Sequence, residues 1–215
     1  MLALGIFGSG GAGRELLEIA TGFLSATWKD AFRIMFVDID GKRQANDCPV
    51  LSPEAFGMVS EGEKRFALGI GDIATRRSVV AQCEASKIEP LSIISISAVV
   101  FASSTLGVGA VVYPLASISA NVTIGRFFRA DMGARIAHDC EIGDNVVISP
   151  GAVVNGRVRI GTDVFIGAGA VIRNGTSRRP LLVGERAIIG MGAIVTRDVG
   201  AGQTVIGNPA RQTSL

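Results

Sequence analysis

An aliphatic residue or alanine recurs at every sixth position over a long stretch of the chain. These positions are Ile94, Val100, Leu106, Val112, Ile118, Ile124, Ala130, Ile136, Ile142, Ile148, Val154, Ile160, Ile166 and Ile172. Six steps of about 100° would leave successive apolar residues about 240° apart on an α-helix, so the period cannot mark one helical face. Six is a multiple of the two-residue repeat of a strand, so each marked side chain can point the same way. The pattern predicts a parallel β-helix of hexapeptide repeats, with three hexads to a triangular coil.

Glycines and one break in the repeat refine this prediction. The glycines that directly follow a marked residue, where a Cβ would crowd a turn, are Gly107, Gly125, Gly143, Gly161 and Gly167. The repeat is interrupted once, because Val183 follows Ile172 by eleven residues and not by six. We expect the polar, turn-rich residues 173–182 to project as a loop, and the repeat to resume at Val183 for about one more coil. The closing residues 205–211 leave the pattern.

The first 90 residues follow a different rule. Apolar runs predict strands at Leu2–Phe7, Ile34–Val37 and Arg65–Ile70. Helical spacing follows the first and third runs, at residues 15–24 and 73–86, with Leu16, Ile19, Ala20 and Phe23 on one side of the first helix. Strands that alternate with helices predict a small parallel α/β sheet, here of about three strands. We therefore expect two domains, residues 1–90 and residues 91–215.

Composition and charge exclude several classes of function. The net charge is only +2, from 21 basic and 19 acidic residues without long runs, which gives no electrostatic reason to expect nucleic acid or a membrane surface as partner. The uncharged residues 91–125 are not expected to span a membrane, because polar residues and glycines interrupt them and they keep the six-residue repeat. Three cysteines without metal-ligand spacing, and a start unlike a signal peptide, lead us to expect a cytoplasmic protein.

A glycine-rich segment connects the first predicted strand to the first helix. Gly8, Gly10 and Gly13 form G-x-G-x-x-G in the strand–turn–helix context where this motif binds phosphate. Asp38 and Asp40 end the second strand, where acids contact a ribose or a base. The glycines could instead form only a tight turn. Because three strands are few for a complete dinucleotide fold, we read the segment as a site for a nucleotide-linked substrate and not for NAD.

His138, the sole histidine, lies in the predicted β-helix and is followed by Asp139. It stands two residues after the inward Ile136, at or near a corner. A neutral imidazole there could accept a proton from an attacking amine or hydroxyl, and the adjacent carboxylate could orient it. An ordinary surface histidine is the alternative. Carbonic anhydrases of the γ class share the solenoid but bind zinc through three histidines, so we expect no metal here.

The chain resembles a known group of proteins in three features taken together. These are the α/β domain, the hexads and the segment Ala137-His138-Asp139-Cys140-Glu141-Ile142-Gly143-Asp144. The chain is similar to bacterial sugar acetyltransferases, which comprise the sialic-acid O-acetyltransferases and the nucleotide-linked 4-amino-sugar N-acetyltransferases. The closing Gly207-Asn208-Pro209-Ala210 is similar to the end of many such enzymes. The resemblance implies a left-handed β-helix, a homotrimer with active sites between subunits, and acetyl-CoA as co-substrate.

The resemblance also implies roles for individual residues. His138 becomes the general base and Asp139 its orienting partner. The expected nucleotide-sugar contacts are Gly8, Gly10, Gly11, Gly13, Asp38, Ile70 and Gly71. Backbone groups near Gly167, Ala168, Gly190 and Gly192 are expected to contact CoA, whose phosphates could meet Arg173, Arg178 or Arg179.

Three residues depart from the family pattern. Val147 stands where several relatives have a second histidine, Asp131 where relatives often have asparagine near the incoming amine, and Ala12 where the glycine loop often has histidine. Asp131 could favour a sugar that carries an ammonium group. It is therefore included among the expected substrate contacts.

These observations predict an acetyl-CoA-dependent N-acetyltransferase that acts on a nucleotide-linked 4-amino-4,6-dideoxy sugar, for surface polysaccharide (lipopolysaccharide) or glycan synthesis. A backbone N–H near Gly156 is expected to stabilise the oxyanion, and Cys140 is expected only to pack. Sugar O-acetylation of the sialic-acid type and a non-catalytic trimeric nucleotide-binding scaffold are the alternatives. The sequence does not distinguish GDP, dTDP and UDP sugars.

Overall fold

The computed structural model describes residues 1–29, 31–39, 44–60 and 62–213. These residues form two compact units, Met1–Ile96 and Ser97–Leu215. Among the described helices, none is both long and apolar enough to cross a membrane.

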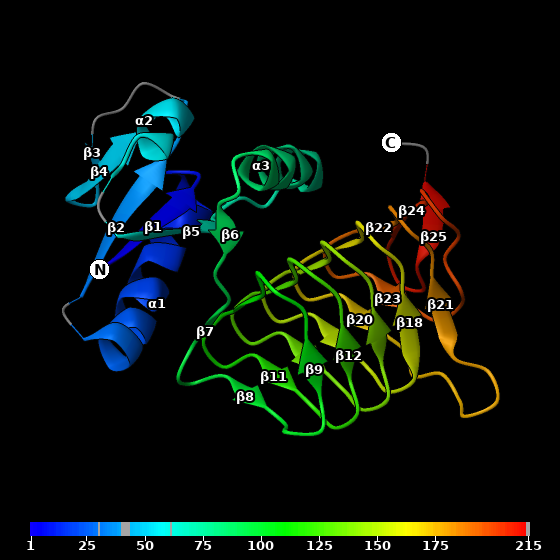
Figure 1. The fold of residues 1–215 in the computed structure, drawn as a ribbon. Coiled ribbons are helices and arrows are strands. Elements are labelled where there is room, and N and C mark those ends of the chain that lie inside the picture. The colour runs from blue at the N-terminus through cyan, green and yellow to red at the C-terminus, as the bar shows by residue number, and fades with distance from the viewer. Residues whose placement is uncertain (30, 40–43, 61, 214–215) are drawn as a thin grey trace. The chain divides into compact units, whose positions relative to one another are not determined.

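The first unit is built on a six-stranded sheet in the order β3-β4-β2-β1-β5-β6 (Figure 1). Its strands are β1 (Leu2–Phe7), β2 (Phe32–Val37), β3 (Gln44–Ala45), β4 (Cys48–Leu51), β5 (Glu63–Leu68) and β6 (Glu89–Pro90). Neighbouring strands run parallel except β3, which pairs antiparallel with β4. Every residue of the central strand β1 is buried, as expected for a parallel sheet covered on both faces.

The expectation of about three strands was too low. The described part of the unit adds β3, β4 and β6 to the three expected strands. Two of the additional strands have only two residues each, and three of the four residues of β4 are half-buried. Strands of two to four residues are too short for an apolar run or an alternating pattern to identify them from the sequence.

The helices of the first unit are α1 (Gly11–Trp28), α2 (Pro53–Gly57) and α3 (Ile73–Ala85). Helix α1 begins four residues before the expected start, because the end of the glycine segment already forms its first turn. Its buried side also differs from the expected one: Leu16, Leu17, Ala20 and Leu24 are buried, whereas Ile19 and Phe23 are half-buried. The expected span of α3 agrees closely, and Asp72 caps it by accepting a hydrogen bond from the Thr75 backbone N–H at 2.8 Å.

A parallel β-helix with three walls of stacked short strands follows, as the hexads predict; its first strand, β7 (Ile93–Ile94), falls within Met1–Ile96, and its other strands form the second unit. The first wall contains β7 (Ile93–Ile94), β10 (Val111–Val112), β13 (Arg129–Ala130), β16 (Val147–Ile148), β19 (Phe165–Ile166), β22 (Ile188–Ile189), β24 (Thr204–Ile206) and the closing antiparallel β25 (Arg211–Thr213). The second wall contains β8 (Val99–Val100), β11 (Ser117–Ile118), β14 (Arg135–Ile136), β17 (Val153–Val154), β20 (Val171–Ile172) and β23 (Ile194–Val195). The third wall contains β9 (Thr105–Leu106), β12 (Thr123–Ile124), β15 (Glu141–Ile142), β18 (Val158–Ile160) and β21 (Leu181–Val183).

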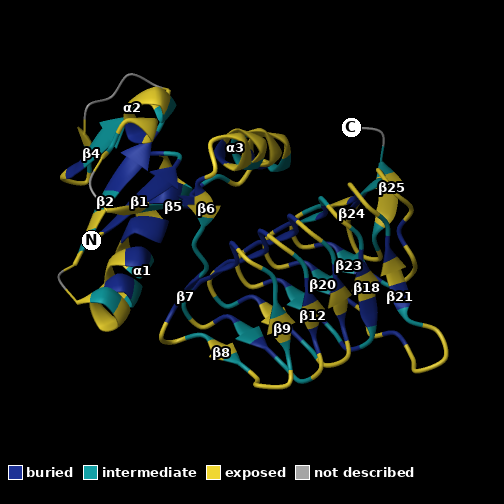
Figure 2. Ribbon diagram, viewed as in Figure 1, coloured by how far each residue is buried: buried dark blue, intermediate teal, exposed yellow. Residues whose placement is uncertain are grey.

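The register confirms that three hexads make one coil. Val111 pairs with Arg129, and Arg129 with Val147, each eighteen residues apart. From Val112 to Ile172 every marked residue is at most 4% exposed. A second set of inward residues, two positions before each marked one, is equally buried and includes Cys140. Buried stretches along the coils are dark blue in Figure 2. The pattern of marked positions alone did not reveal this second set.

Glycines after marked residues allow neighbouring coils to approach closely. A Cβ on Gly107 would lie 2.5 Å from the backbone of Gly125, and one on Gly161 would lie 2.5 Å from the backbone nitrogen of Glu185. Any side chain at these positions would therefore push two coils apart, which explains why the repeat places glycine there.

After the projecting loop, the repeat includes more residues than expected. Leu181 and Leu182 were expected in the loop, but they belong to β21, where Leu181 is buried against β18. The loop thus comprises residues 173–180 (orange in Figure 1). The chain end was expected to leave the repeat, yet β24 adds a further parallel strand to β22, because Val205 supplies one more buried aliphatic residue.

Candidate functional site

His138 and Asp139 lie in the turn that joins β14 of the second wall to β15 of the third. The same turn recurs in each coil, and its residues are called here the second–third corner. Asn121, Asp139 and Arg157, each eighteen residues from the next, occupy equivalent places and have positive φ of 58°, 58° and 60°. Asn and Asp tolerate this left-handed conformation better than most residues. The corner of three successive coils thus presents an amide, a carboxylate and a guanidinium in a row.

The carboxylate of Asp139 is the centre of this row. His138 Nδ1 lies 2.8 Å from Asp139 Oδ2, and Asn121 Nδ2 donates to Asp139 Oδ1 at 3.2 Å. Arg157 Nη2 lies 3.4 Å from the same Oδ2 as the imidazole. The hydrogen bond from His138, followed by that from Asn121, lowers the pKa of Asp139 below its usual 3.8. An ionised carboxylate only accepts hydrogen bonds, so Nδ1 of His138 carries a proton toward Asp139, and in the neutral form of the ring Nε2 is the acceptor.

The imidazole rests against Gly156, one coil further along the corner. A Cβ on Gly156 would lie 2.7 Å from Cε1 and 2.8 Å from Nε2 of His138. The absence of a side chain there is therefore what leaves space for the ring. The ring remains 48% exposed, so a reacting group can reach Nε2.

Cys140 does not share this access. Its side chain is buried, and the thiol lies 3.3 Å from the carbonyl oxygen of Asn155. Burial raises the pKa of this thiol above 9.0, mainly by desolvation. A buried, protonated thiol is a poor nucleophile. Cys140 belongs to the packed interior of the coil, as expected.

In the first unit, the glycine segment combines packed and open positions. Gly8 has a φ of +98°, and a Cβ on Gly13 would lie 1.9 Å from the Gly8 carbonyl oxygen, so both are glycines for structural reasons. By contrast, a Cβ on Gly10, Gly11 or Gly71 would meet nothing within 4 Å. These three glycines border open space, and Gly10 and Gly11 stand at the start of α1, where no side chain caps the helix.

Asp38 is engaged within the same unit. Its Oδ2 accepts hydrogen bonds from both the backbone N–H and the hydroxyl of Ser9, each at 2.7 Å. This pairing ties the end of β2 to the glycine segment. Asp40, the other acid expected at this edge, lies outside the described residues. Ile70 stands beside Gly71, and its carbonyl oxygen accepts a hydrogen bond at 3.1 Å from the buried guanidinium of Arg76.

Asp131 makes a buried ion pair in the β-helix. Its Oδ1 lies 2.5 Å from Nε of Arg129, and both side chains are buried. The guanidinium also lies over the ring of Tyr113, 4.8 Å from its centroid. The charge of Asp131 is therefore balanced within the chain, which weakens the argument that it attracts an ammonium group.

The residues expected to contact CoA lie at two different corners. Gly156 and Arg173 lie at the second–third corner with His138. The others lie at the turns between the first and second walls, called here the first–second corner: Gly167, Ala168, Gly190 and Gly192. Close packing explains Gly167 and Gly190, since a Cβ on either would meet a neighbouring coil at 2.5 or 2.6 Å, and Gly192 has a φ of +65°. One chain does not bring all the expected CoA contacts together.

Sequence reasoning missed two residues of the site. Asn121 and Arg157 contact Asp139, and their spacing of eighteen residues on either side of it could have identified them. Among the described residues, no group of three or more His, Cys, Asp or Glu side chains could bind a metal ion.

Comparisons with known proteins agree with this geometry. The family described as "Bacterial transferase hexapeptide (six repeats)" matches residues 121–156 and 139–174. GDP-perosamine N-acetyltransferase of Escherichia coli O157:H7 is 41% identical over 210 residues, which cover 97% of this chain and 95% of the relative. The chain belongs to the hexapeptide-repeat sugar N-acetyltransferases. This family membership makes the chain an acetyltransferase and its solenoid a left-handed β-helix.

Solved structures extend the likeness of this acetyltransferase to both units. WeeI from Acinetobacter baumannii AYE is 35% identical with a TM-score of 0.93, and the match covers 99% of this chain and 100% of WeeI. PerB from Caulobacter crescentus, solved in complex with CoA and GDP-perosamine, is 27% identical with a TM-score of 0.86 over 99% and 97% of the two chains.

Proposed function

We propose that this acetyltransferase moves the acetyl group of acetyl-CoA to the amino group of a GDP-linked 4-amino-4,6-dideoxy sugar of the perosamine type. The observation that carries the proposal is the half-exposed His138, held by the Asp139 carboxylate at 2.8 Å and seated on Gly156. The relative that covers nearly the whole chain is named for GDP-perosamine, which favours GDP over the other nucleotides.

His138 acts as the general base in this proposal. The sugar amine attacks the thioester carbonyl carbon, a C–N bond forms, and Nε2 takes a proton from the amine nitrogen. Asp139 holds Nδ1 and stabilises the imidazolium that results. The C–S bond then breaks, and the departing sulfur can take the proton back from Nε2. Proton transfer of this kind contributes about 10²–10⁴-fold in rate.

The oxyanion requires a donor close to the imidazole. Gly156 lies against the ring, and we propose its backbone N–H as the donor to the reacting carbonyl group. A fixed N–H at such a place stabilises the charge that develops on the carbonyl oxygen. Gly156 would thus both make space for the base and support the developing charge.

The α/β domain, which we place at residues 1–90 by its sequence pattern, would bind the nucleotide part of the sugar. Open space beside Gly10, Gly11 and Gly71 allows a ligand to approach the backbone closely. The uncapped start of α1 presents N–H groups to a pyrophosphate. Asp38, together with Gly8, Gly13 and Ile70, would shape this site, with Asp38 orienting the loop through Ser9.

The acetyl-CoA site requires a second copy of the chain. Arg173 and Gly156 lie at one corner of the coil, whereas Gly167, Ala168, Gly190 and Gly192 lie at another. In a homotrimer with sites between adjacent β-helices, the first–second corner of one copy faces the second–third corner of its neighbour. Both sets of residues then border one groove. We place the enzyme in the cytoplasm, in the synthesis of a surface polysaccharide such as lipopolysaccharide.

A panel assay tests this proposal. Release of free thiol from acetyl-CoA is measured with GDP-perosamine, with dTDP- and UDP-linked 4-amino sugars, and with a sialic acid. We expect turnover with GDP-perosamine and at least tenfold lower kcat/KM with the other nucleotides. Release only with the sialic acid would transfer the activity to a hydroxyl acceptor and contradict the proposal.

A further inference from the structure

Arg157 reaches the His138–Asp139 pair from the coil that follows it. Its backbone N–H donates to the His138 carbonyl oxygen at 3.0 Å, and its own carbonyl oxygen accepts a hydrogen bond from the Leu181 N–H at 3.1 Å. The backbone of Arg157 is therefore fixed between two neighbouring coils. Its side chain extends back to the preceding coil, where Nη2 lies 3.4 Å from Asp139 Oδ2.

One carboxylate oxygen thus has two nitrogen partners. His138 Nδ1 lies 2.8 Å and Arg157 Nη2 lies 3.4 Å from Asp139 Oδ2, whereas Oδ1 accepts from the uncharged amide of Asn121. Because both distances end on the same atom, Nδ1 and Nη2 cannot be more than 6.2 Å apart. When the imidazole takes up a proton, two positive charges therefore lie close together beside a single carboxylate.

The turns that border the imidazole contribute few other charged groups. The preceding coil places Ala120 and Asn121 at this corner, and both are uncharged. The following coil places Gly156 there, next to Arg157. The turn of His138 itself adds Asp139 and the buried thiol of Cys140.

Charged side chains also stand on the two adjoining walls. Arg135, three residues before His138, is exposed on the second wall. On the third wall, Arg159 Nη2 lies 2.9 Å from Glu141 Oε1, so these two charges balance each other. Neither arginine is recorded in contact with the carboxylate of Asp139.

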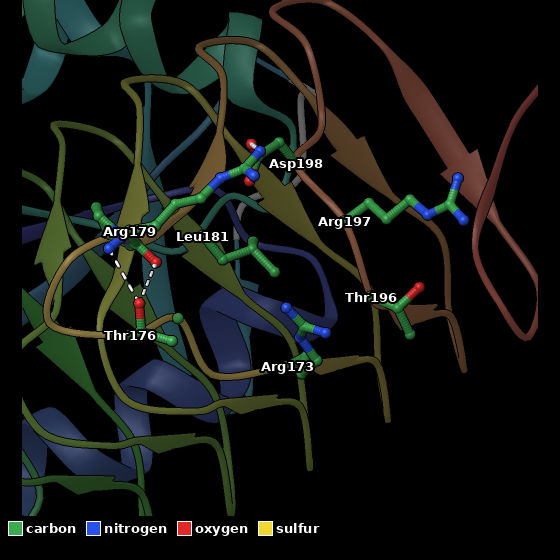
Figure 3. A pocket seen from close by; sticks show the side chains of 9 residues that line it. Arg173, Thr176, Arg179, Leu181, Thr196, Arg197 and Asp198 are labelled. Atoms are coloured by element: carbon green, nitrogen blue, oxygen red, sulfur yellow. Dashed lines mark hydrogen bonds and ion pairs between the residues drawn. The ribbon is translucent and has the colours of Figure 1, made fainter.

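The remaining arginines of this corner lie further along the solenoid. Arg173 and Arg179 line a separate cavity of about 560 Å³ beside the projecting loop (Figure 3). Arg179 points toward Asp198, which lies 3.3 Å away. With about 4.8 Å between stacked strands, Arg173 lies two coils, or roughly 10 Å, beyond His138. Within the described part of this corner, Arg157 is thus the arginine that reaches the carboxylate of the base.

We infer that Arg157 adjusts the strength of the general base: it competes with His138 for Asp139 and opposes the positive charge of the imidazolium. The inference rests on the proposed function, in which Nε2 takes a proton from the sugar amine and returns it to the departing sulfur. Asp139 alone favours the imidazolium, and an imidazole that is already protonated cannot accept a proton. By opposing that charge, Arg157 keeps the ring neutral to a lower pH. Arg157 is a positioning residue here, because it acts through Asp139 and the imidazole.

The size of the effect follows from the separation and the exposure. The side chains of His138 and Arg157 are 48% and 40% exposed, so water screens their charges. Two unit charges about 6 Å apart in water shift each other's titration by about half a pH unit at low ionic strength. Salt at about 1 M reduces the screening length to about 3 Å and should remove most of this shift. An exposed ion pair contributes little to stability, so Arg157→Gln should fold like the wild type.

A titration of the imidazole tests the inference without any substrate. His138 is the sole histidine, so NMR of the untagged enzyme with ¹³C-labelled histidine reports this ring alone. At low salt, the midpoint for Arg157→Gln should lie about half a pH unit above that of the wild type. Arg157→Lys keeps the charge and should stay close to the wild-type midpoint. Arg159→Gln, whose guanidinium is paired with Glu141, is the matched control and should not move it.

The pH dependence of thiol release gives a second readout. In Arg157→Gln the acidic limb of kcat/KM for the sugar should move upward by the same half unit, which lowers kcat/KM about threefold at one pH unit below the wild-type midpoint. The KM for acetyl-CoA should stay within about twofold.

Three outcomes would contradict the account, each at a different point. Midpoints that Arg157→Gln leaves unchanged would overturn the inference and leave acetyl transfer intact. A raised KM for acetyl-CoA with an unchanged midpoint would overturn it too, and would mean that Arg157 binds the co-substrate. An NMR shift of the expected size in an enzyme that transfers no acetyl group would instead contradict the proposed function.

Discussion

Replacing Gly156 by alanine tests whether the imidazole position controls the reaction. The new Cβ would lie 2.7 Å from Cε1 and 2.8 Å from Nε2 of His138, whereas carbon atoms in contact lie about 3.5–4.0 Å apart. The ring must therefore move by about 1 Å, which its 48% exposure permits. A misplacement of that size costs about 10²-fold, so we expect kcat to fall about 10²-fold, or about 2.7 kcal/mol in activation free energy.

The same substitution should leave folding unharmed. Gly156 does not have a positive φ, so alanine fits its backbone and slightly reduces the entropy of the unfolded chain. Alanine also keeps the backbone N–H, so a loss of activity would report the base and not the oxyanion donor. The melting temperature should be unchanged or slightly raised. Gly22→Ala, where a Cβ meets nothing within 4 Å, is the matched control and should keep full activity.

A double-mutant cycle makes the reasoning refutable. If Gly156→Ala acts by displacing the imidazole, it should cost nothing further in a His138→Ala background. Steady-state thiol release measures both variants and the double variant. Fully additive losses, or a Gly156→Ala enzyme within twofold of wild type, would refute the argument.

Three further predictions follow from the site and the core. Carbon NMR should show the carboxyl of Asp139 titrating below pH 3.8. Asn121→Ala should move the titration midpoint upward, because it removes a hydrogen bond that lowers the pKa of Asp139. An unchanged midpoint would exclude the Asn121 contact. Iodoacetamide on the native enzyme at pH 8 should leave activity intact, because burial raises the pKa of Cys140, whereas stoichiometric inactivation would mean that a thiol takes part. Ile148→Ala should lower the free energy of unfolding by about 2–5 kcal/mol, because removal of this fully buried side chain leaves a cavity. Denaturant unfolding at fixed protein concentration measures the change. A decrease below about 1 kcal/mol would mean that the coil collapses around the gap.

The β-helix could be predicted in detail because one physical rule repeats in every coil. Each marked residue points inward, so a shift of a strand by one residue would expose an aliphatic side chain. Each following glycine permits close stacking of neighbouring coils. The rule also located the insertion after Ile172. It failed at the exact end of the loop, because the buried Leu181 belongs to the second set of inward residues, two positions before Val183, which the marked positions alone do not reveal.

The first unit was less predictable. Its short strands are defined by pairing, β3 with β4 in a local hairpin, β4 with β2 and β6 with β5, and they are too short to show a periodicity. The site shows a similar division. The His138–Asp139 pair is adjacent in sequence, so its hydrogen bond could be anticipated. Asn121 and Arg157 reach Asp139 only through stacking of coils, which a reading along the chain does not reveal unless positions eighteen residues apart are compared.

The central claim is N-acetylation with His138 as the base. The most direct test incubates acetyl-CoA and GDP-perosamine with wild type or His138→Ala and identifies the product by mass spectrometry. We predict an N-acetylated GDP-sugar from the wild type, and a kcat lowered by about 10²–10⁴-fold in a variant that still binds CoA and keeps its melting temperature. A His138→Ala enzyme with wild-type turnover, or a product acetylated on oxygen, would contradict the account.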